Sequence, residues 1–148
     1  MSDLKSIPER WAAAWSQDNT AAFVELFSPK AVYTDHAFQV ISTNIRDHHK
    51  IWRVANPDFR VILDPSTPIW WAGDVDEHGK NGSCSFRTIN YGTNTGDLPT
   101  RKASGKNFQF SAMLHLTIKD GLIILMDEFY RDTFDESVPI EKFRIHDS

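Results

Sequence analysis

The sequence predicts a single α+β domain in which helices come first and a mostly antiparallel sheet follows. Up to about residue 55, apolar residues recur with helical spacing in three segments, with a strand at residues 31–38 between the second and the third, and after that the pattern changes to a period of two. The chain has 148 residues, of which 41% are hydrophobic, and this is enough for one domain with its own core. We therefore treat residues 1–148 as one domain with its helices on one face of the sheet.

Two helices are predicted near the N-terminus. The first runs over Ile7–Ser16, with Ser6 as a candidate N-cap and a proline in its first turn. A short second helix begins at an N-cap at Asn19 or Thr20 and ends before Ser28-Pro29. Within the first helix, Trp11 and Trp15 are four residues apart and lie on one helical face.

A third helix is predicted from an N-cap at Thr43 or Asn44 to about residue 55, where Asn56-Pro57 stops it. A helical wheel assigns His48 to the inward stripe and leaves His49 exposed. The inward stripe is Ile45, His48, Ile51, Trp52 and Ala55.

The clearest strand pair is a hairpin near the C-terminus. Residues 107–119 alternate strictly, which predicts a strand with one buried face, and Asp120-Gly121 after it is a two-residue turn signal. Closing the hairpin there pairs Lys119 with Leu122 and Leu114 with Asp127. The other predicted strands span residues 31–38, 59–63, 69–72, 84–92 and 122–132.

This register puts Asp127 on the apolar face of the sheet. A carboxylate in such a position is costly unless it is paired, protonated or beside a cavity. An ion pair with Arg87 or Arg131 would satisfy it, but we favour a carboxylate that lines a pocket.

Composition excludes several classes of function. The net charge is −4 without a run of Lys or Arg, so we expect neither a nucleic-acid partner nor a membrane partner. A single cysteine, Cys84, excludes an internal disulfide, and the histidines lack metal-ligand spacing. No glycine-rich phosphate motif is present, so we expect no cofactor. Because neither a signal peptide nor a membrane span is evident, we expect a cytoplasmic protein.

Two sets of stretches resemble known families. Those similar to ketosteroid isomerases are Arg10–Trp15, Asp18-Asn19, Val24–Phe27 and Ala31–Asp35; those similar to SnoaL-like polyketide cyclases are Asn56–Val61, Gly92–Pro99, Ser104–Lys106 and Lys119–Ile123. The chain thus resembles the NTF2-like superfamily over residues 7–134. The resemblance implies a cone, with a curved mixed or antiparallel sheet wrapped around three N-terminal helices.

The resemblance also implies roles for particular positions. In ketosteroid isomerases the position that matches Asp35 is the general base, and the position that matches Trp11 is a tyrosine that donates to the oxyanion. Trp11 departs from this pattern, although its indole N–H is also a donor. A second donor, a protonated aspartic acid, would align near Leu114. In the SnoaL-like cyclases an acid near the end of the last strand acts as acid or base, a role that Asp127 or Asp132 would fill.

The predicted site therefore has Asp35 and Asp127 as the acid/base pair, with His48 as a proton relay. Arg87 and Tyr91 line the pocket if their face of residues 84–92 points inward, and the alternate residues do so otherwise. By parity, His115 belongs to the outer face. The remaining predicted substrate contacts are Trp11, Trp15, Tyr33, Trp52, Leu114, Phe129 and Arg131.

The predicted function is a cofactor-independent isomerase, cyclase or dehydratase that transfers protons on an apolar, oxygenated secondary metabolite, such as a polyketide, terpenoid or steroid-like molecule. One alternative is a limonene-type epoxide hydrolase, which needs an Asp35–Arg87–Asp127 network to activate water. The other is a non-catalytic NTF2-like ligand-binding or association module, for which a filled cone is expected. The resemblance further implies a homodimer through the outer face of the sheet.

Overall fold

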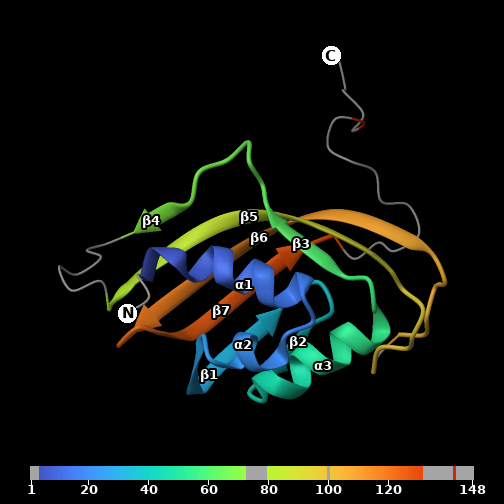
Figure 1. Ribbon diagram of the computed structural model, residues 1–148, viewed down its shortest axis with the longest axis horizontal. Helices are drawn as coiled ribbons and strands as arrows, with labels where there is room; N and C mark the ends of the chain where they lie inside the picture. The colour runs from blue at the N-terminus through green and yellow to red at the C-terminus, as the bar shows by residue number, and fades with distance from the viewer. Residues whose placement is uncertain (1–3, 73–79, 100, 132–141, 143–148) are drawn as a thin grey trace.

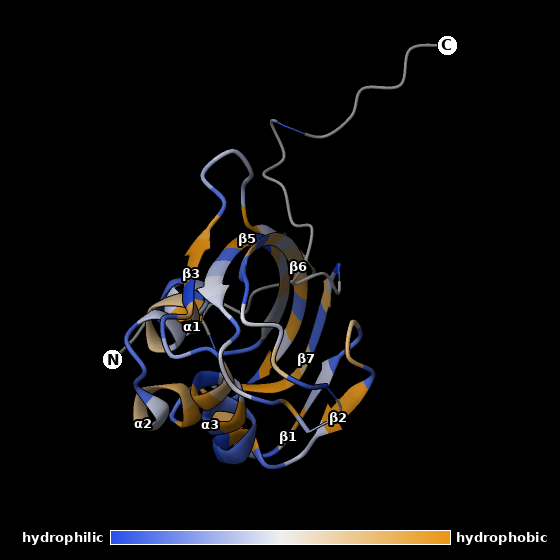
Figure 2. Ribbon diagram, turned by 90° about the vertical axis from the view of Figure 1, so that its right-hand side faces the viewer, coloured by the Kyte–Doolittle hydropathy of each residue, from blue (hydrophilic) through white to orange (hydrophobic). Residues whose placement is uncertain are grey.

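The computed structural model describes residues 4–72, 80–99, 101–131 and 142. Three helices lie on the concave face of a strongly curved sheet (Figures 1 and 2), which confirms the predicted α+β cone. The helices are α1 (Ile7–Ser16), α2 (Thr20–Val24) and α3 (Ile45–Ala55), and a 3₁₀ turn at Leu4–Ser6 precedes α1. The strands are β1 (Phe27–Asp35), β2 (Val40–Ser42), β3 (Arg60–Leu63), β4 (Trp70–Ala72), β5 (Gly82–Thr93), β6 (Asn107–Lys119) and β7 (Leu122–Tyr130).

The sheet has the strand order β2-β1-β7-β6-β5-β3, and β4 also pairs with β5. Strands β1 and β7 run parallel, whereas the other pairs are antiparallel. An early strand and the last strand therefore lie side by side (Figure 1). In this pairing Asp35 is the partner of Glu128.

Two of the predicted N-caps are formed. The side chain of Asn19 accepts a hydrogen bond from the Ala22 N–H, and that of Asn44 accepts one from the Asp47 N–H. Ser6 precedes α1 but makes no capping bond; its hydroxyl accepts from Arg10 Nε at 3.0 Å. None of the helices in the described part of the chain is long and apolar enough to cross a membrane.

The β6–β7 hairpin closes as predicted and then departs from the predicted register. Asp120 and Gly121 both have positive φ, 52° and 81°, and Lys119 pairs with Leu122. One step later Ile118 pairs with Ile123, but Thr117 pairs with Leu125. Ile124 is thus an extra residue in β7, a β-bulge.

The bulge reverses the prediction for Asp127. From this point β7 is displaced by one residue, so Leu114 pairs with Glu128 and His115 pairs with Asp127. Because side chains alternate along a strand, Glu128 faces the interior and Asp127 the outer surface. Glu128 is only 7% exposed. The expectation that Asp127 lies on the inner face is therefore wrong, and its neighbour takes that place.

Candidate active site

Four polar side chains converge on the inner face where β1 and β7 run side by side. Tyr33 and Asp35 come from β1, and Glu128 and Tyr130 come from β7. The hydroxyl of Tyr33 donates to Glu128 Oε2 at 2.6 Å, and that of Tyr130 donates to Asp35 Oδ2 at 2.7 Å. The Phe38 N–H also donates to Asp35 Oδ1, at 3.0 Å. Both carboxyl groups are buried, and each accepts from a phenol.

The surroundings of Glu128 favour its protonated form. Burial raises the pKa of Glu128 to about 8, and the adjacent charge of Asp35 acts in the same direction, while the bond from Tyr33 opposes both. Burial, followed by the charges of the carboxylates, also raises the pKa of Tyr33 and Tyr130, so both phenols remain donors. Glu128 therefore keeps its proton at neutral pH, and Asp35 is the second carboxyl group beside it.

A pocket of about 160 Å³ leads to this group from between α3, β2 and the loop after β5. Its lining is mainly apolar, and its polar residues include Asp35 of the carboxyl pair and His48. Asp35, His48 and Trp52 also line a second space of about 10 Å³ that Glu128 and Tyr130 border. Asp35 therefore borders the pocket itself, whereas Glu128 borders only the smaller space behind it. The other pocket residues are Phe38, Val40, Ser42, Asn44, Asp47, Ile51, Leu98 and Pro99.

The two adjacent histidines of α3 occupy different environments. His48 lines the pocket as predicted, with its ring centre 4.3 Å from that of Tyr33. Burial, assisted by the charge of His49, lowers the pKa of His48 to about 4, so its imidazole is neutral. The expectation that His49 is exposed is wrong. His49 is fully buried and bonds the Thr20 hydroxyl and the Ala14 carbonyl, at 2.9 and 3.1 Å.

The predicted tryptophans surround the inner end of the site. Trp11, Trp15 and Trp52 all border the smaller space beside Glu128. The indole N–H of Trp11 is fully buried and makes no hydrogen bond within the described part of the chain. A buried donor of this kind is costly to leave unused, which suits it to a ligand oxygen. Leu114 also faces inward, directly opposite Glu128.

Strand β5 presents its other face to the interior. Phe86, Thr88 and Asn90 are buried there, so Arg87 and Tyr91 point to the outer face. Arg87 lies 3.5 Å from Asp64, and the Arg60 guanidinium lies 5.1 Å from the Tyr91 ring centre. Placement of Arg87 and Tyr91 in the pocket is therefore wrong. The Asp35–Arg87–Asp127 network that epoxide hydrolysis would need is not formed.

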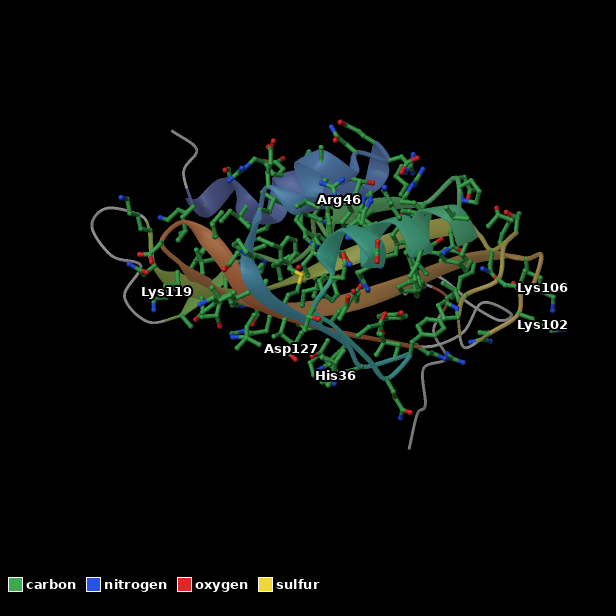
Figure 3. All side chains as sticks on the ribbon, turned by 90° about the horizontal axis from the view of Figure 1, so that it is seen from below. His36, Arg46, Lys102, Lys106, Lys119 and Asp127 are labelled. Atoms are coloured by element: carbon green, nitrogen blue, oxygen red, sulfur yellow. The ribbon has the colours of Figure 1, made fainter. Side chains whose placement is uncertain are left out.

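Three further predicted residues lie outside the pocket. Asp127 bonds His36 Nε2 at 2.8 Å on the outer face (Figure 3). Phe129 is 50% exposed on the same face, because the bulge turned it outward together with Asp127. Arg131 follows β7 and is exposed.

His115 lies on the outer face as predicted, bonded to Ser85. The alternative acid, Asp132, lies outside the described residues.

Sequence reasoning missed Glu128 and Tyr130. A signal for Glu128 was present, because two adjacent acids in a strand must face opposite sides, so either register turns one of them inward. Tyr130 is two residues after Glu128 in the same strand, so it faces the same side and could have been predicted together with it. Among the described residues, no group of three His, Cys, Asp or Glu side chains is placed to hold a metal ion.

Neither protein-family models nor the curated proteins yield a match to the chain. Solved structures do. A protein with a ketosteroid isomerase-like fold from Catenulispora acidiphila, in complex with trimethylamine, is 21% identical with a TM-score of 0.68, over 86% of this chain and 87% of that one. A candidate SnoaL-like polyketide cyclase from Jannaschia sp. is 16% identical with a TM-score of 0.65, over 86% and 84%.

An NTF2-like protein from Burkholderia thailandensis is 17% identical with a TM-score of 0.64, over 88% of this chain and 92% of that one. Identities this low carry information about the fold alone. The matches cover most of both chains in each case, so the likeness concerns the whole cone. The chain therefore has the NTF2-like fold, which it shares with ketosteroid isomerase-like and SnoaL-like proteins.

Proposed function

We propose that this protein is a cofactor-independent enzyme that moves a proton on carbon in an apolar, oxygenated small molecule. The observation that carries the proposal is the pairing of Asp35 with Glu128, two buried carboxyl groups on neighbouring strands at the end of an apolar pocket. A buried acid with a raised pKa beside a second carboxyl group is a common basis for acid/base catalysis. The likeness to candidate polyketide cyclases supports the same class of chemistry.

The different positions of the two acids support complementary roles for them. Asp35 borders the pocket and is the base that removes a proton beside a carbonyl group. The electron pair then moves onto the carbonyl oxygen. Glu128 in its protonated form and the Trp11 N–H are donors for that oxygen at the inner end of the site. Asp35, now protonated, returns the proton at another carbon, which completes an isomerisation.

This assignment differs from the sequence-based one in the second acid. Asp127 lies on the outer face, so Glu128 takes the role expected of it. His48 is a neutral group beside Asp35 that helps to position the ligand. The hydroxyls of Tyr33 and Tyr130 hold the carboxyl groups in place, each through a bond of less than 3 Å.

The proposal is tested with cyclohex-3-enone, whose isomerisation to cyclohex-2-enone moves a proton from C2 to C4. We expect Asp35→Asn to lower the rate by about 100-fold or more, because a positioned base contributes about 10²- to 10⁴-fold. We expect Glu128→Gln to lower it by about tenfold or more, because the amide is a weaker donor. Ultraviolet absorbance and deuterium uptake from D₂O measure the rates.

Glu25→Gln, which removes an exposed acid of the α2 terminus, serves as the control and is expected to keep the wild-type rate. Wild-type rates in both Asp35→Asn and Glu128→Gln would refute the assignment. Binding of the enone by the wild-type protein without isomerisation or exchange would instead favour the ligand-binding module. The observation that favours this second candidate is the small volume beside Glu128, about 10 Å³, because a filled cone is expected of a non-catalytic module.

A further inference from the structure

Asp35 stands at the end of its strand. β1 ends at Asp35, and a turn with positive φ at Gln39 follows before β2 begins. The last backbone bond between β1 and β7 joins the His36 N–H to the Glu128 carbonyl at 2.9 Å. Strand ends separate more readily than strand centres. The spacing between Asp35 and Glu128 therefore depends on what holds this end of β1 against β7.

Three side chains hold it on the outer face, directly behind the two acids. His36 Nε2 bonds Asp127 Oδ1 at 2.8 Å, which ties β1 to β7. The His36 ring also stacks on Phe129, with 3.9 Å between ring centres and 6° between planes. Figure 3 shows His36 and Asp127 next to each other on the side of the sheet away from α1. We call these three residues the outer clamp.

The outer clamp and the inner acids alternate along the same two segments. His36 follows Asp35, while Asp127 and Phe129 flank Glu128. Any movement of His36 away from β7 is therefore transmitted through one peptide unit to Asp35. Phe129 likewise precedes Tyr130, whose hydroxyl bonds Asp35 from the inside.

We propose that His36, Asp127 and Phe129 are positioning residues, which fix the separation of Asp35 and Glu128 from the opposite face of the sheet. The catalytic part of this inference rests on the proposed function, whereas the part that concerns the separation of the two acids does not. The clamp contacts neither the pocket nor the smaller space, so it acts only through the strands.

If the outer clamp only stabilised the fold, its removal would lower the free energy of unfolding and leave the pKa of Glu128 unchanged. The exposed fractions of the His36 and Asp127 side chains are 37% and 34%, and polar contacts this exposed contribute little to stability. Removing the clamp would therefore change unfolding only slightly. It would, however, weaken the repulsion from Asp35, which is one of the two causes that raise the pKa of Glu128. The other titratable groups that face Glu128 are Tyr33 from β1, Tyr130 from β7 and His48 from α3. None of the three belongs to the outer clamp, so the variants below leave their side chains unchanged.

The deciding measurement is the titration of the Glu128 carboxyl group by ¹³C NMR, in full-length protein labelled at glutamate and assigned with Glu128→Gln. We expect His36→Ala, which removes the hydrogen bond to Asp127 and the stacking on Phe129, to lower the Glu128 midpoint by about one pH unit. Asp127→Asn keeps an acceptor for His36 but loses the charge, so we expect a smaller shift in the same direction. Leu125→Ala, a change on the same strand and face, is the control.

A second readout is the isomerisation of cyclohex-3-enone. His36→Ala is expected to lower kcat by about tenfold with little change in KM, because small displacements of reacting groups are costly. An unchanged Glu128 midpoint in His36→Ala, equal to that in Leu125→Ala, would overturn the proposal. If the wild-type protein does not isomerise the enone, the proposed function fails, but the NMR titration still decides whether the clamp sets the separation of the acids.

Discussion

Asp127 and Glu128 show how the face of a strand decides the chemistry of an acid. The two residues are adjacent in the sequence, yet Asp127 bonds a histidine on the outer surface and Glu128 bonds a buried phenol. Burial and the nearby Asp35 raise the pKa of Glu128 to about 8. An ordinary side chain thereby becomes an acid that retains its proton at neutral pH.

This shift predicts how stability depends on pH. The ordinary pKa of the glutamic acid is 4.5, and in the folded protein it is about 8, so the folded state binds the proton more tightly. The stabilisation is fully present below 4.5 and is lost as the pH rises through 8. We expect urea unfolding to show a loss of about 3 kcal/mol between pH 5 and pH 8, and Glu128→Gln to lack most of it. An equal pH dependence in the wild type and Glu128→Gln would contradict this.

At the scale of elements, the turn of the β6–β7 hairpin could be predicted and the register beyond it could not. Asp120-Gly121 fixes the turn through its need for positive φ. The next residues, 122–126, are all apolar and therefore do not alternate, so the sequence does not reveal which of them is extra. Ile124 fills the bulge, and every assignment after it is displaced by one residue.

For helix α3 and strand β5, the side-chain orientations could not be predicted from the sequence because contacts with other elements decide them. His49 is off the apolar stripe of α3, but its partners Thr20 and Ala14 come from α2 and α1, and they satisfy it in the core. In β5 both faces carry plausible site residues, so parity remained open until the pairing with β6 was known. Asp35 and Trp11, by contrast, both line the small space beside Glu128, and the roles that the family resemblance implies for them stay predictions.

The loop between β5 and β6 is another element that shapes the site. Asn94 is buried there; its amide donates to Asn56 Oδ1 at 3.1 Å, and its oxygen accepts from the Ser104 N–H at 2.7 Å. The same loop brings Leu98 and Pro99 to the pocket.

We expect Asn94→Ala to lower the free energy of unfolding by about 2–4 kcal/mol, because several buried groups lose their partner. Urea unfolding measures this effect. Asn107 is exposed, and its side-chain oxygen accepts from the Thr93 hydroxyl at 2.8 Å. Asn107→Ala is expected to change stability by less than about 1 kcal/mol. Equal effects of the two variants would show that Asn94 does not organise the loop.

At the scale of the whole molecule, the outer face of the sheet carries exposed apolar side chains among its polar ones. Several large apolar side chains are exposed on it, across strands from both halves of the chain. A patch of this kind usually marks an interaction surface. The homodimer implied by the family resemblance stays a prediction, and it would bury this patch. The exposed residues are Ile62, Trp70, Met113, Leu125 and Phe129.

We expect the wild-type protein to be a dimer by light scattering after size-exclusion chromatography, and Met113→Glu to be a monomer, because a charge in the middle of an apolar interface is costly. Val54→Glu is the matched control, since Val54 is 74% exposed on α3 and not on the outer face of the sheet. A monomeric wild-type protein, or a dimer that Met113→Glu leaves intact, would refute this interface.

The parallel pairing of β1 with β7 has a consequence for folding. Each of the two phenol–carboxyl bonds joins residues that are 95 positions apart in the sequence. Contacts this distant form late, because the closure of a long loop costs entropy before the contact rewards it. A chain emerging from the ribosome holds Tyr33 and Asp35 in β1 long before Glu128 exists. The acid pair therefore assembles only when the last strand docks, and its appearance marks the completion of the cone.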